Sequence, residues 1–281
     1  PILFLPGDTY ANRIPDPVLQ QVEHFNNPGI TANDAFKPVT RYFDRITRPE
    51  QIIQSFPAAV QTMLDPADCG PACIALSQDI QGQTYDYPEE FFNEKLHTIR
   101  RPRPDEFQIK EAAEKIKSSK NPIIISGGGV FYSDAMEELS NFAIKHNIPV
   151  TQTVMGYSSM KRDHSHYAGQ IGGLGGKNTN SLAKQTDLAI AVGTKLADFT
   201  TGSWANFENE NFKLVSINVS RFDANKHLAQ AVVGDAKVSL DELSLALGEW
   251  KADDEWNKKS QIELKAWNEE VDKESAPTNQ E

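Results

Sequence analysis

Two motifs in the second half of the chain have residue types that could bind a ligand. Residues 127–129 are three consecutive glycines directly after an apolar run, which is typical of a dinucleotide-binding loop. His164 and His166 have the spacing H-x-H, which can belong to a metal site. Neither pattern is complete. The glycines are not G-x-G-x-x-G and no acidic residue follows at a strand end, while Asp163 alone adds a metal-ligand type, so a solvated loop is the competing interpretation there.

The cysteines and several aspartates have simpler interpretations. Cys69 and Cys73 are spaced C-x3-C, one residue more than the redox motif C-x-x-C, and we interpret them as small apolar residues around a turn that enters a strand at residues 73–76. No disulfide framework is implied. Four aspartates stand at the ends of predicted strands or in loops and are interpreted as turn or capping residues: Asp187, Asp198, Asp223 and Asp235.

The elements that would position these motifs form one repeating pattern. Short apolar runs occur at residues 121–126, 149–153, 187–193 and 213–219. Strands that are apolar at nearly every position are expected in a parallel sheet with helices on both faces. Between the first two runs, Met136, Leu139 and Ala143 have helical spacing behind Ser133, a predicted N-cap. We therefore predict an α/β fold with a Rossmann-like parallel sheet over residues 121–247.

Loops at the carboxyl ends of such strands bind ligands in α/β folds. Residues 154–157, Val-Met-Gly-Tyr, occupy such a position and are a candidate site lining, with a turn around a packed Met as the alternative.

The first hundred residues predict part of another α/β sheet. Residues 2–5 form an apolar run that predicts a buried strand, and Asp16 begins a predicted amphipathic helix. Thr47 and Glu50 fit a capping box ahead of a second helix. Residues 85–104 are rich in proline and arginine and are interpreted as a linker, whose arginines are solvated or paired with acidic groups.

Composition excludes some classes of protein. The chain has 281 residues and a formal net charge of −11, which argues against a nucleic-acid partner, because phosphate binding depends on an excess of Lys and Arg. No apolar run approaches the roughly 18 to 20 residues of a membrane helix, and no signal-peptide pattern precedes the first predicted strand. We expect a cytoplasmic protein with a small-molecule substrate and no membrane partner.

Several short sequence motifs follow one another in a defined order along the chain. They include PILFLPGD at residues 1–8, CGPACIALSQDIQ at 69–81, ISGGG at 125–129, GQIGGLG at 169–175 and TDLAIAVGT at 186–194. In this order the chain resembles the thiamine-diphosphate enzymes related to acetohydroxyacid synthase. Residues 7–24, 33–41, 85–88, 198–201 and 217–223 are most similar to the members of that group that hydrolyse a cyclic 1,2-diketone in inositol catabolism.

The resemblance implies three domains in sequence, of which this chain would hold part. Residues 1–100 would be the C-terminal half of an α/β pyrimidine-binding domain with its linker, and residues 101–250 the middle domain. Residues 251–281 would connect to a missing diphosphate-binding domain. The chain therefore resembles a fragment, and half of an α/β domain should expose a sheet edge and an apolar face.

The resemblance also implies the chemistry. Such enzymes use thiamine diphosphate and Mg²⁺ to cleave a C–C bond, here opening a ring to 5-deoxy-glucuronate, and they act as a homo-oligomer, a dimer or tetramer. Family members take the catalytic Glu from the first half of the first domain and the magnesium-binding Gly-Asp-Gly from the third, and this chain has no Gly-Asp-Gly. We therefore predict no catalytic and no metal-binding residue here.

One residue could line the cofactor site. Gln20 falls where related synthases have a Gln near the cofactor, with an exposed helix position as the alternative. The alternatives for function are a carboligase like acetolactate synthase, a 2-keto acid decarboxylase, or a module that binds FAD or ADP. Flavin-binding relatives carry Met-His where this chain has residues 172–175 and acidic residues where it has Asn218 and Ser220, so FAD is not expected.

Overall fold

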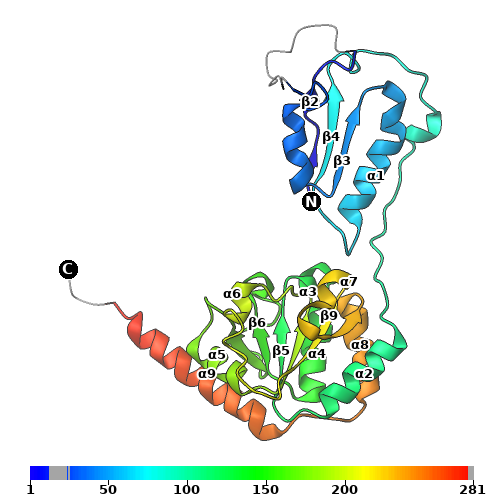
Figure 1. The fold of residues 1–281 in the computed structure, drawn as a ribbon. Coiled ribbons are helices and arrows are strands. Elements are labelled where there is room, and N and C mark those ends of the chain that lie inside the picture. The colour runs from blue at the N-terminus through cyan, green and yellow to red at the C-terminus, as the bar shows by residue number, and fades with distance from the viewer. Residues whose placement is uncertain (13–23, 25, 278–281) are drawn as a thin grey trace. The chain divides into compact units, whose positions relative to one another are not determined.

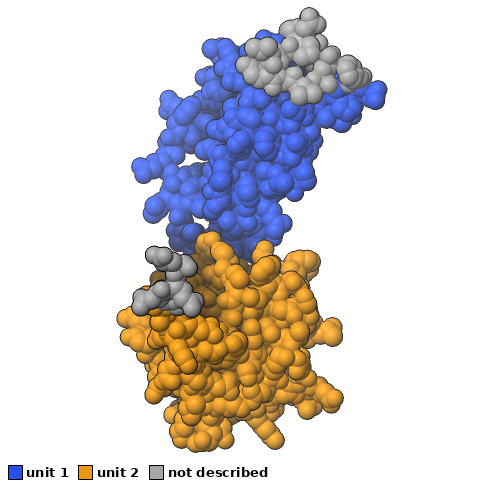
Figure 2. All heavy atoms as spheres, turned by 90° about the vertical axis from the view of Figure 1, so that its left-hand side faces the viewer, with its two compact units in different colours: residues 1–100 blue, residues 101–281 orange. Residues whose placement is uncertain are grey.

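The computed structural model describes residues 1–12, 24 and 26–277. They form two compact units, residues 1–100 and 101–281 (Figures 1 and 2). Gln20 and most of the helix predicted to begin at Asp16 lie outside the described residues. Among the described helices, none is long and apolar enough to span a membrane.

The first unit contains a small parallel sheet. Its strands are β1 (Leu3–Phe4), β2 (Gly7–Asp8), β3 (Tyr42–Ile46) and β4 (Ala72–Ser77). Strand β4 is central, because it pairs with β1 and β2 at successive positions and also with β3. Helix α1 (Ile52–Leu64) packs against β3 and β4, and the 3-10 helix η1 (Ala32–Val39) contacts β3.

Two local predictions for this unit are wrong. Strand β1 is not buried, since Phe4 is 45% exposed and its neighbours Ile2 and Leu5 are more exposed still. The apolar run therefore lies at a sheet edge, and the predicted exposure of apolar side chains is confirmed. The capping box uses Gln51 rather than Glu50, because a 3-10 turn, η2 (Pro49–Gln51), precedes α1. Gln51 Oε1 accepts the backbone N–H of Thr47 at 2.6 Å.

The second unit contains a sheet of six parallel strands in the order β10-β9-β8-β5-β6-β7. The strands are β5 (Pro122–Ser126), β6 (Val150–Gln152), β7 (Tyr167–Gln170), β8 (Leu188–Val192), β9 (Lys213–Asn218) and β10 (Gln230–Val233). The chain builds outward in one direction from β5 to β7 and in the other from β8 to β10. The predicted Rossmann-like α/β fold is confirmed (Figure 1).

Helices cover both faces of this sheet. They are α2 (Glu106–Lys117), α3 (Gly129–Tyr132), α4 (Met136–His146), α5 (Lys177–Gln185), α6 (Asp198–Thr201), α7 (Arg221–Ala224), α8 (Ala236–Leu247) and α9 (Asp254–Glu274). Along β5, Ile124 packs in a core with α2, α4 and α8, whereas Ile123 and Ile125 pack in a second core with α5 and Trp256 of α9. This alternation explains why the strands are apolar at every position.

Ser133 is not the N-cap of α4. Helix α4 begins at Met136, and Ser133 ends the separate turn α3. The Ser133 hydroxyl instead accepts the backbone N–H of Ala236 at 3.3 Å, which joins this turn to the start of α8. Asp105 is the N-cap of α2, because its carboxylate accepts the N–H of Phe107 at 2.9 Å.

Helix α9 packs on the same unit as the six-stranded sheet. Trp256 is buried and its indole Nε1 donates to the carbonyl of Pro122 at 2.8 Å, and Leu264 is also buried. The helix contacts α5 and β7. Residues 254–274 therefore add a helix to one face of the sheet.

Candidate functional site

The glycines at residues 127–129 follow β5, next to the loop after β8. This is the point where the strand order reverses and where α/β folds usually bind nucleotides. Here the two loops pack backbone against backbone: the N–H of Gly129 donates to the carbonyl of Gly193 at 2.9 Å. A Cβ atom on Gly129 would lie 2.6 Å from the Cα of Gly193, and one on Gly127 would lie 2.5 Å from its carbonyl oxygen. The glycines therefore permit close packing of two loops, and the dinucleotide-loop interpretation is not supported.

The residues at the positions compared with flavin-binding relatives make hydrogen bonds within the protein. The side-chain amide of Asn180 makes two hydrogen bonds of 3.0 Å with the backbone of Gly172. Asn218 donates to the carbonyl of Thr194 at 3.2 Å and accepts the N–H of Ser220 at 2.9 Å. These groups hold loops together and offer no acidic pair to a ribose.

The loop at residues 154–157 contains the 3-10 helix η4 (Val154–Gly156) at the carboxyl end of β6. Thr153 caps this turn by accepting the N–H of Gly156 at 3.0 Å. Met155 is 71% exposed and Tyr157 is half exposed, so the alternative of a turn around a packed Met is wrong. The loop therefore exposes large apolar side chains at the carboxyl edge of the sheet.

The histidine motif does not form a metal site. The Nδ1 atom of His164 accepts the N–H of His166 at 3.1 Å, so its Nε2 must donate to Ser140 Oγ. The Nε2 atom of His166 lies 3.1 Å from the amide oxygen of Asn147. Each ring is thus held by protein groups, and the part of the chain described here contains no cluster of three or more metal-ligand side chains.

A third histidine, His146, lies in the same region and is fully buried. Its Nδ1 donates to the carbonyl of Trp250 at 2.8 Å and its Nε2 accepts from Ser244 Oγ at 3.0 Å. Burial lowers the pKa of His146, His164 and His166 below the ordinary value of 6.5. The neighbours of His146 oppose one another, since Lys145 and Lys251 also lower its pKa and Glu249 raises it.

We expect acid to destabilise the second unit through these three histidines. A histidine whose pKa is lowered by folding binds more protons in the unfolded state, so its contribution to stability is complete above pH 6.5 and is lost as pH falls below that value. The melting temperature followed by Trp fluorescence should fall by several degrees between pH 7.5 and pH 5.5. The variant H164N, which keeps an acceptor but cannot be protonated, should show a smaller fall, and an equal fall would contradict this assignment.

Of the four aspartates predicted to be turn or capping residues, Asp187 and Asp235 take that role. Asp198 is instead the first residue of α6, and Asp223 lies inside α7 and pairs with Lys226. Cys69 and Cys73 are free, the first exposed and the second buried. Asp187 accepts the N–H groups of Lys120 and Asn121. Asp235 caps α8 by accepting the N–H of Lys237 at 3.0 Å. Arg101 pairs with Asp235 and Arg103 with Glu242, which confirms that linker arginines meet acidic groups.

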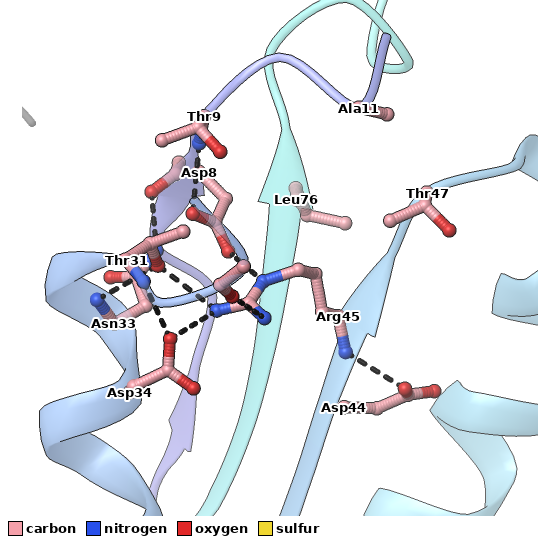
Figure 3. A network of polar contacts seen from close by, with 12 residues as sticks. Asp8, Thr9, Ala11, Thr31, Asn33, Asp34, Asp44, Arg45, Thr47 and Leu76 are labelled. Carbon is pink, nitrogen blue, oxygen red and sulfur yellow. Dashed lines mark hydrogen bonds and ion pairs between the residues drawn. The ribbon is translucent and has the colours of Figure 1, made fainter. Parts of the chain in front are cut away.

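The sequence reasoning missed a network at the carboxyl edge of the first sheet (Figure 3). Arg45 on β3 donates from Nε to Asp8 Oδ2 at 2.6 Å, and from Nη2 to Asp34 Oδ2 at 2.7 Å and Thr31 Oγ1 at 3.0 Å. The Asp8 side chain, at the end of β2, is fully buried. In the sequence, Gly7-Asp8 is only a Gly-Asp pair that lacks the following Gly of a magnesium motif. An acidic residue at a strand end and a basic residue on a neighbouring strand were the available signal.

The charges of this network depend on one another. Burial opposes ionisation of Asp34, but hydrogen bonds from Lys37, the Thr31 N–H and Arg45 hold the pKa of Asp34 well below its ordinary value of 3.8. Burial likewise lowers the pKa of Arg45, and its hydrogen bonds to Asp8 and Asp34 more than compensate and raise it. Asp34 and Arg45 therefore stay charged across the physiological range.

The first comparison with known proteins concerns the second unit. Residues 109–243 match the family model described as the thiamine pyrophosphate enzyme, central domain. The sheet and helices of the second unit include these residues, so this unit is similar to the central domain of a thiamine pyrophosphate enzyme.

Several similar proteins share one name. The chain is 46% identical over 271 residues to 3D-(3,5/4)-trihydroxycyclohexane-1,2-dione hydrolase of Clostridium perfringens. This alignment covers 96% of the chain and 42% of the relative. Enzymes of the same name from Clostridium tetani and Bacillus subtilis are 48% and 47% identical over 87% and 86% of the chain. Each of these two alignments covers 38% of the relative, so the chain spans well under half the length of these proteins.

The described residues do not fit a magnesium ion that would hold the diphosphate group of thiamine diphosphate. They contain no group of three metal-ligand side chains, and the sequence contains no Gly-Asp-Gly. The aspartates of the two Gly-Asp pairs are already engaged, Asp8 with Arg45 and Asp235 with Arg101 and the start of α8.

Proposed function

We propose that this chain forms part of a thiamine-diphosphate-dependent hydrolase that cleaves a C–C bond of trihydroxycyclohexane-1,2-dione and opens the ring to 5-deoxy-glucuronate. The observation that carries the proposal is the 46% identity over 96% of the chain to a hydrolase named for that substrate. The central-domain match over residues 109–243 supports it independently. Bound thiamine diphosphate would supply the electron sink for the bond cleavage.

The proposal also assigns domains of the whole enzyme to segments of this chain. The first unit would contribute half of the pyrimidine-binding domain, residues 101–250 the middle domain, and residues 251–281 the connection to a diphosphate-binding domain. The magnesium ligands and the catalytic Glu would come from parts of the enzyme that this chain does not contain. The whole enzyme would be a homo-oligomer, because enzymes of this kind build the cofactor site between two subunits.

The apolar side chains exposed on the first unit support this division. Ile2, Phe4 and Leu5 are each at least 45% exposed along the sheet edge formed by β1 and its flanks. An exposed apolar patch on a sheet edge favours association with another protein surface. The missing half of the domain would cover it.

The experiment that tests the function is an activity assay of the full-length protein. With thiamine diphosphate and Mg²⁺ present, it should open trihydroxycyclohexane-1,2-dione, and product formation can be followed by chromatography and mass spectrometry. Carboligation of two 2-keto acids, or their decarboxylation, without ring opening would instead support one of the alternative activities. A nucleotide-binding module is disfavoured, because the crevice between the loops after β5 and β8 is filled by their own backbone.

A further inference from the structure

The connection between α8 and α9, residues 248–253, is attached to the end of α4 by several hydrogen bonds. His146 is the last residue of α4, and its ring donates from Nδ1 to the carbonyl of Trp250 at 2.8 Å. The backbone N–H of Ala252 donates to the carbonyl of His146 at 2.9 Å. The side-chain amide of Asn147, the next residue, donates to the carbonyl of Ala252 at 3.2 Å. The end of α4 thus holds the connection at two of its residues.

The loop before β7 supports this attachment through Asn147. The Nε2 atom of His166 lies 3.1 Å from the amide oxygen of Asn147, which leaves the NH2 group to face the connection. That NH2 group also donates to Asp254 Oδ1 at 2.9 Å. His166 is held in turn by His164, whose Nδ1 accepts the N–H of His166 at 3.1 Å. Three histidines therefore act on one connection, His146 directly and the other two through Asn147.

These hydrogen bonds require neutral rings. The Nδ1 atom of His164 can accept the N–H of His166 only while it carries no proton, because a proton there would set two N–H groups against each other. The Nε2 atom of His146 likewise accepts from Ser244 Oγ at 3.0 Å, and that hydroxyl also accepts from Lys145 Nζ at 3.3 Å. A proton on His146 would place a cation in a fully buried position. Acid therefore opposes the hydrogen bonds of both rings.

Charged neighbours modify this effect without removing it. The charged side chains that act on the three rings are Lys145, Asp163, Glu249 and Lys251. Burial is the largest cause and lowers the pKa of each ring below 6.5. The two lysines lower the pKa of His146 further, whereas the two carboxylates act in the opposite direction without reversing the shift. A form in which the rings meet water therefore binds more protons than the closed form.

We propose that His146, His164 and His166 form an acid-sensitive latch, which holds residues 248–253 against α4 at neutral pH and releases them when the rings are protonated. The released segment leads into α9. This helix stays attached to the sheet, because the indole N–H of Trp256 is bound to the first residue of β5. The opening is therefore local and leaves the sheet intact. The latch goes beyond the proposed function, since it depends on no cofactor and no substrate.

The first test is hydrogen exchange of residues 1–281 at pH 7.5 and pH 5.5, expressed as protection factors so that the intrinsic pH dependence of amide exchange is removed. The peptide covering residues 248–256 should lose protection by about 10-fold for each histidine that is protonated only in the open form. Its exchange should not respond to about 1 M urea, because a local opening exposes little surface, whereas exchange in β8 should accelerate. An equal urea response in both peptides would show that the connection opens only by global unfolding and would overturn the proposal.

Two variants separate the latch from the rest of the unit. H146N/H164N keeps an amide group that can donate or accept at each Nδ1 position but cannot be protonated, so its loss of protection in acid should be much smaller than that of the wild type. N147G preserves the positive φ of 52° and removes the amide, so it should expose the connection already at pH 7.5. The matched control is H97N, because His97 is exposed in the linker, and its loss in acid should equal that of the wild type. In variants shown folded by circular dichroism, a wild-type loss in H146N/H164N, or wild-type protection of N147G at pH 7.5, would refute the latch.

Discussion

Titration of thiamine diphosphate with Mg²⁺ into residues 1–281 is expected to give no binding heat, and the chain is expected to give no turnover. The hard cation would need carboxylate oxygens beside the diphosphate. Of the two Gly-Asp pairs, Asp8 is buried against Arg45 and Asp235 is bound to Arg101 and the start of α8. Freeing the fully buried Asp8 carboxylate would break its pair with Arg45, which costs roughly 3 to 5 kcal/mol.

The control for this prediction is the full-length protein titrated under the same conditions, which should bind the cofactor. Circular dichroism must first show that residues 1–281 are folded. Binding to this chain with micromolar affinity would contradict the prediction. It would mean that the chain holds a complete cofactor site and that the proposed division between its two units and the rest of the enzyme is wrong.

Substitution of one glycine beside α6 is expected to be the most destabilising small change in the second unit. Gly172 has φ +103°, and a Cβ atom there would lie 2.1 Å from the carbonyl oxygen of Phe199. The backbone cannot move aside, because the N–H of Gly173 donates to that same carbonyl at 2.7 Å. We expect G172A to lower the free energy of unfolding of this unit by roughly 3 kcal/mol, the sum of overpacking and an unfavourable φ.

The neighbouring residue offers a matched control. A Cβ atom on Gly173 would meet the Phe199 ring at 3.5 Å, an ordinary contact, so G173A should change stability by less than about 0.5 kcal/mol. All four tryptophans, Trp204, Trp250, Trp256 and Trp267, lie in the second unit, so urea unfolding followed by Trp fluorescence reports on that unit alone. Equal midpoints for G172A and G173A would show that the loop relaxes around the added methyl group.

The architecture of the second unit could be predicted because it depends on local pattern. Runs such as residues 122–126 are apolar at every position, and a strand with this composition must be covered on both faces. The same holds for residues 188–192, which are fully buried in β8. Helix and strand boundaries were less predictable where two elements share a turn. Ser133 has the type of an N-cap, but its hydroxyl is used by Ala236, more than a hundred residues away.

The contacts of the candidate site residues could be predicted less well from the sequence. The glycines at residues 127–129 matched only part of a dinucleotide-binding motif, and the reason for them depends on Gly193, which contacts them from the loop after β8. For His164 and His166 the sequence left a metal site and a solvated loop as alternatives, and it could not show that Ser140 and Asn147 bind the two rings.

By itself, the sequence determined the parallel α/β class, the order of the strands along the chain and the resemblance to thiamine-diphosphate enzymes, because periodicity and motif order are properties of the chain. Only the tertiary structure decided which polar residues are already satisfied. Arg45 meets Asp8 across 37 residues and Arg101 meets Asp235 across 134. Pairing of this kind depends on distance in space, and distance in space follows from how the strands are ordered in the sheet and not from spacing in the sequence.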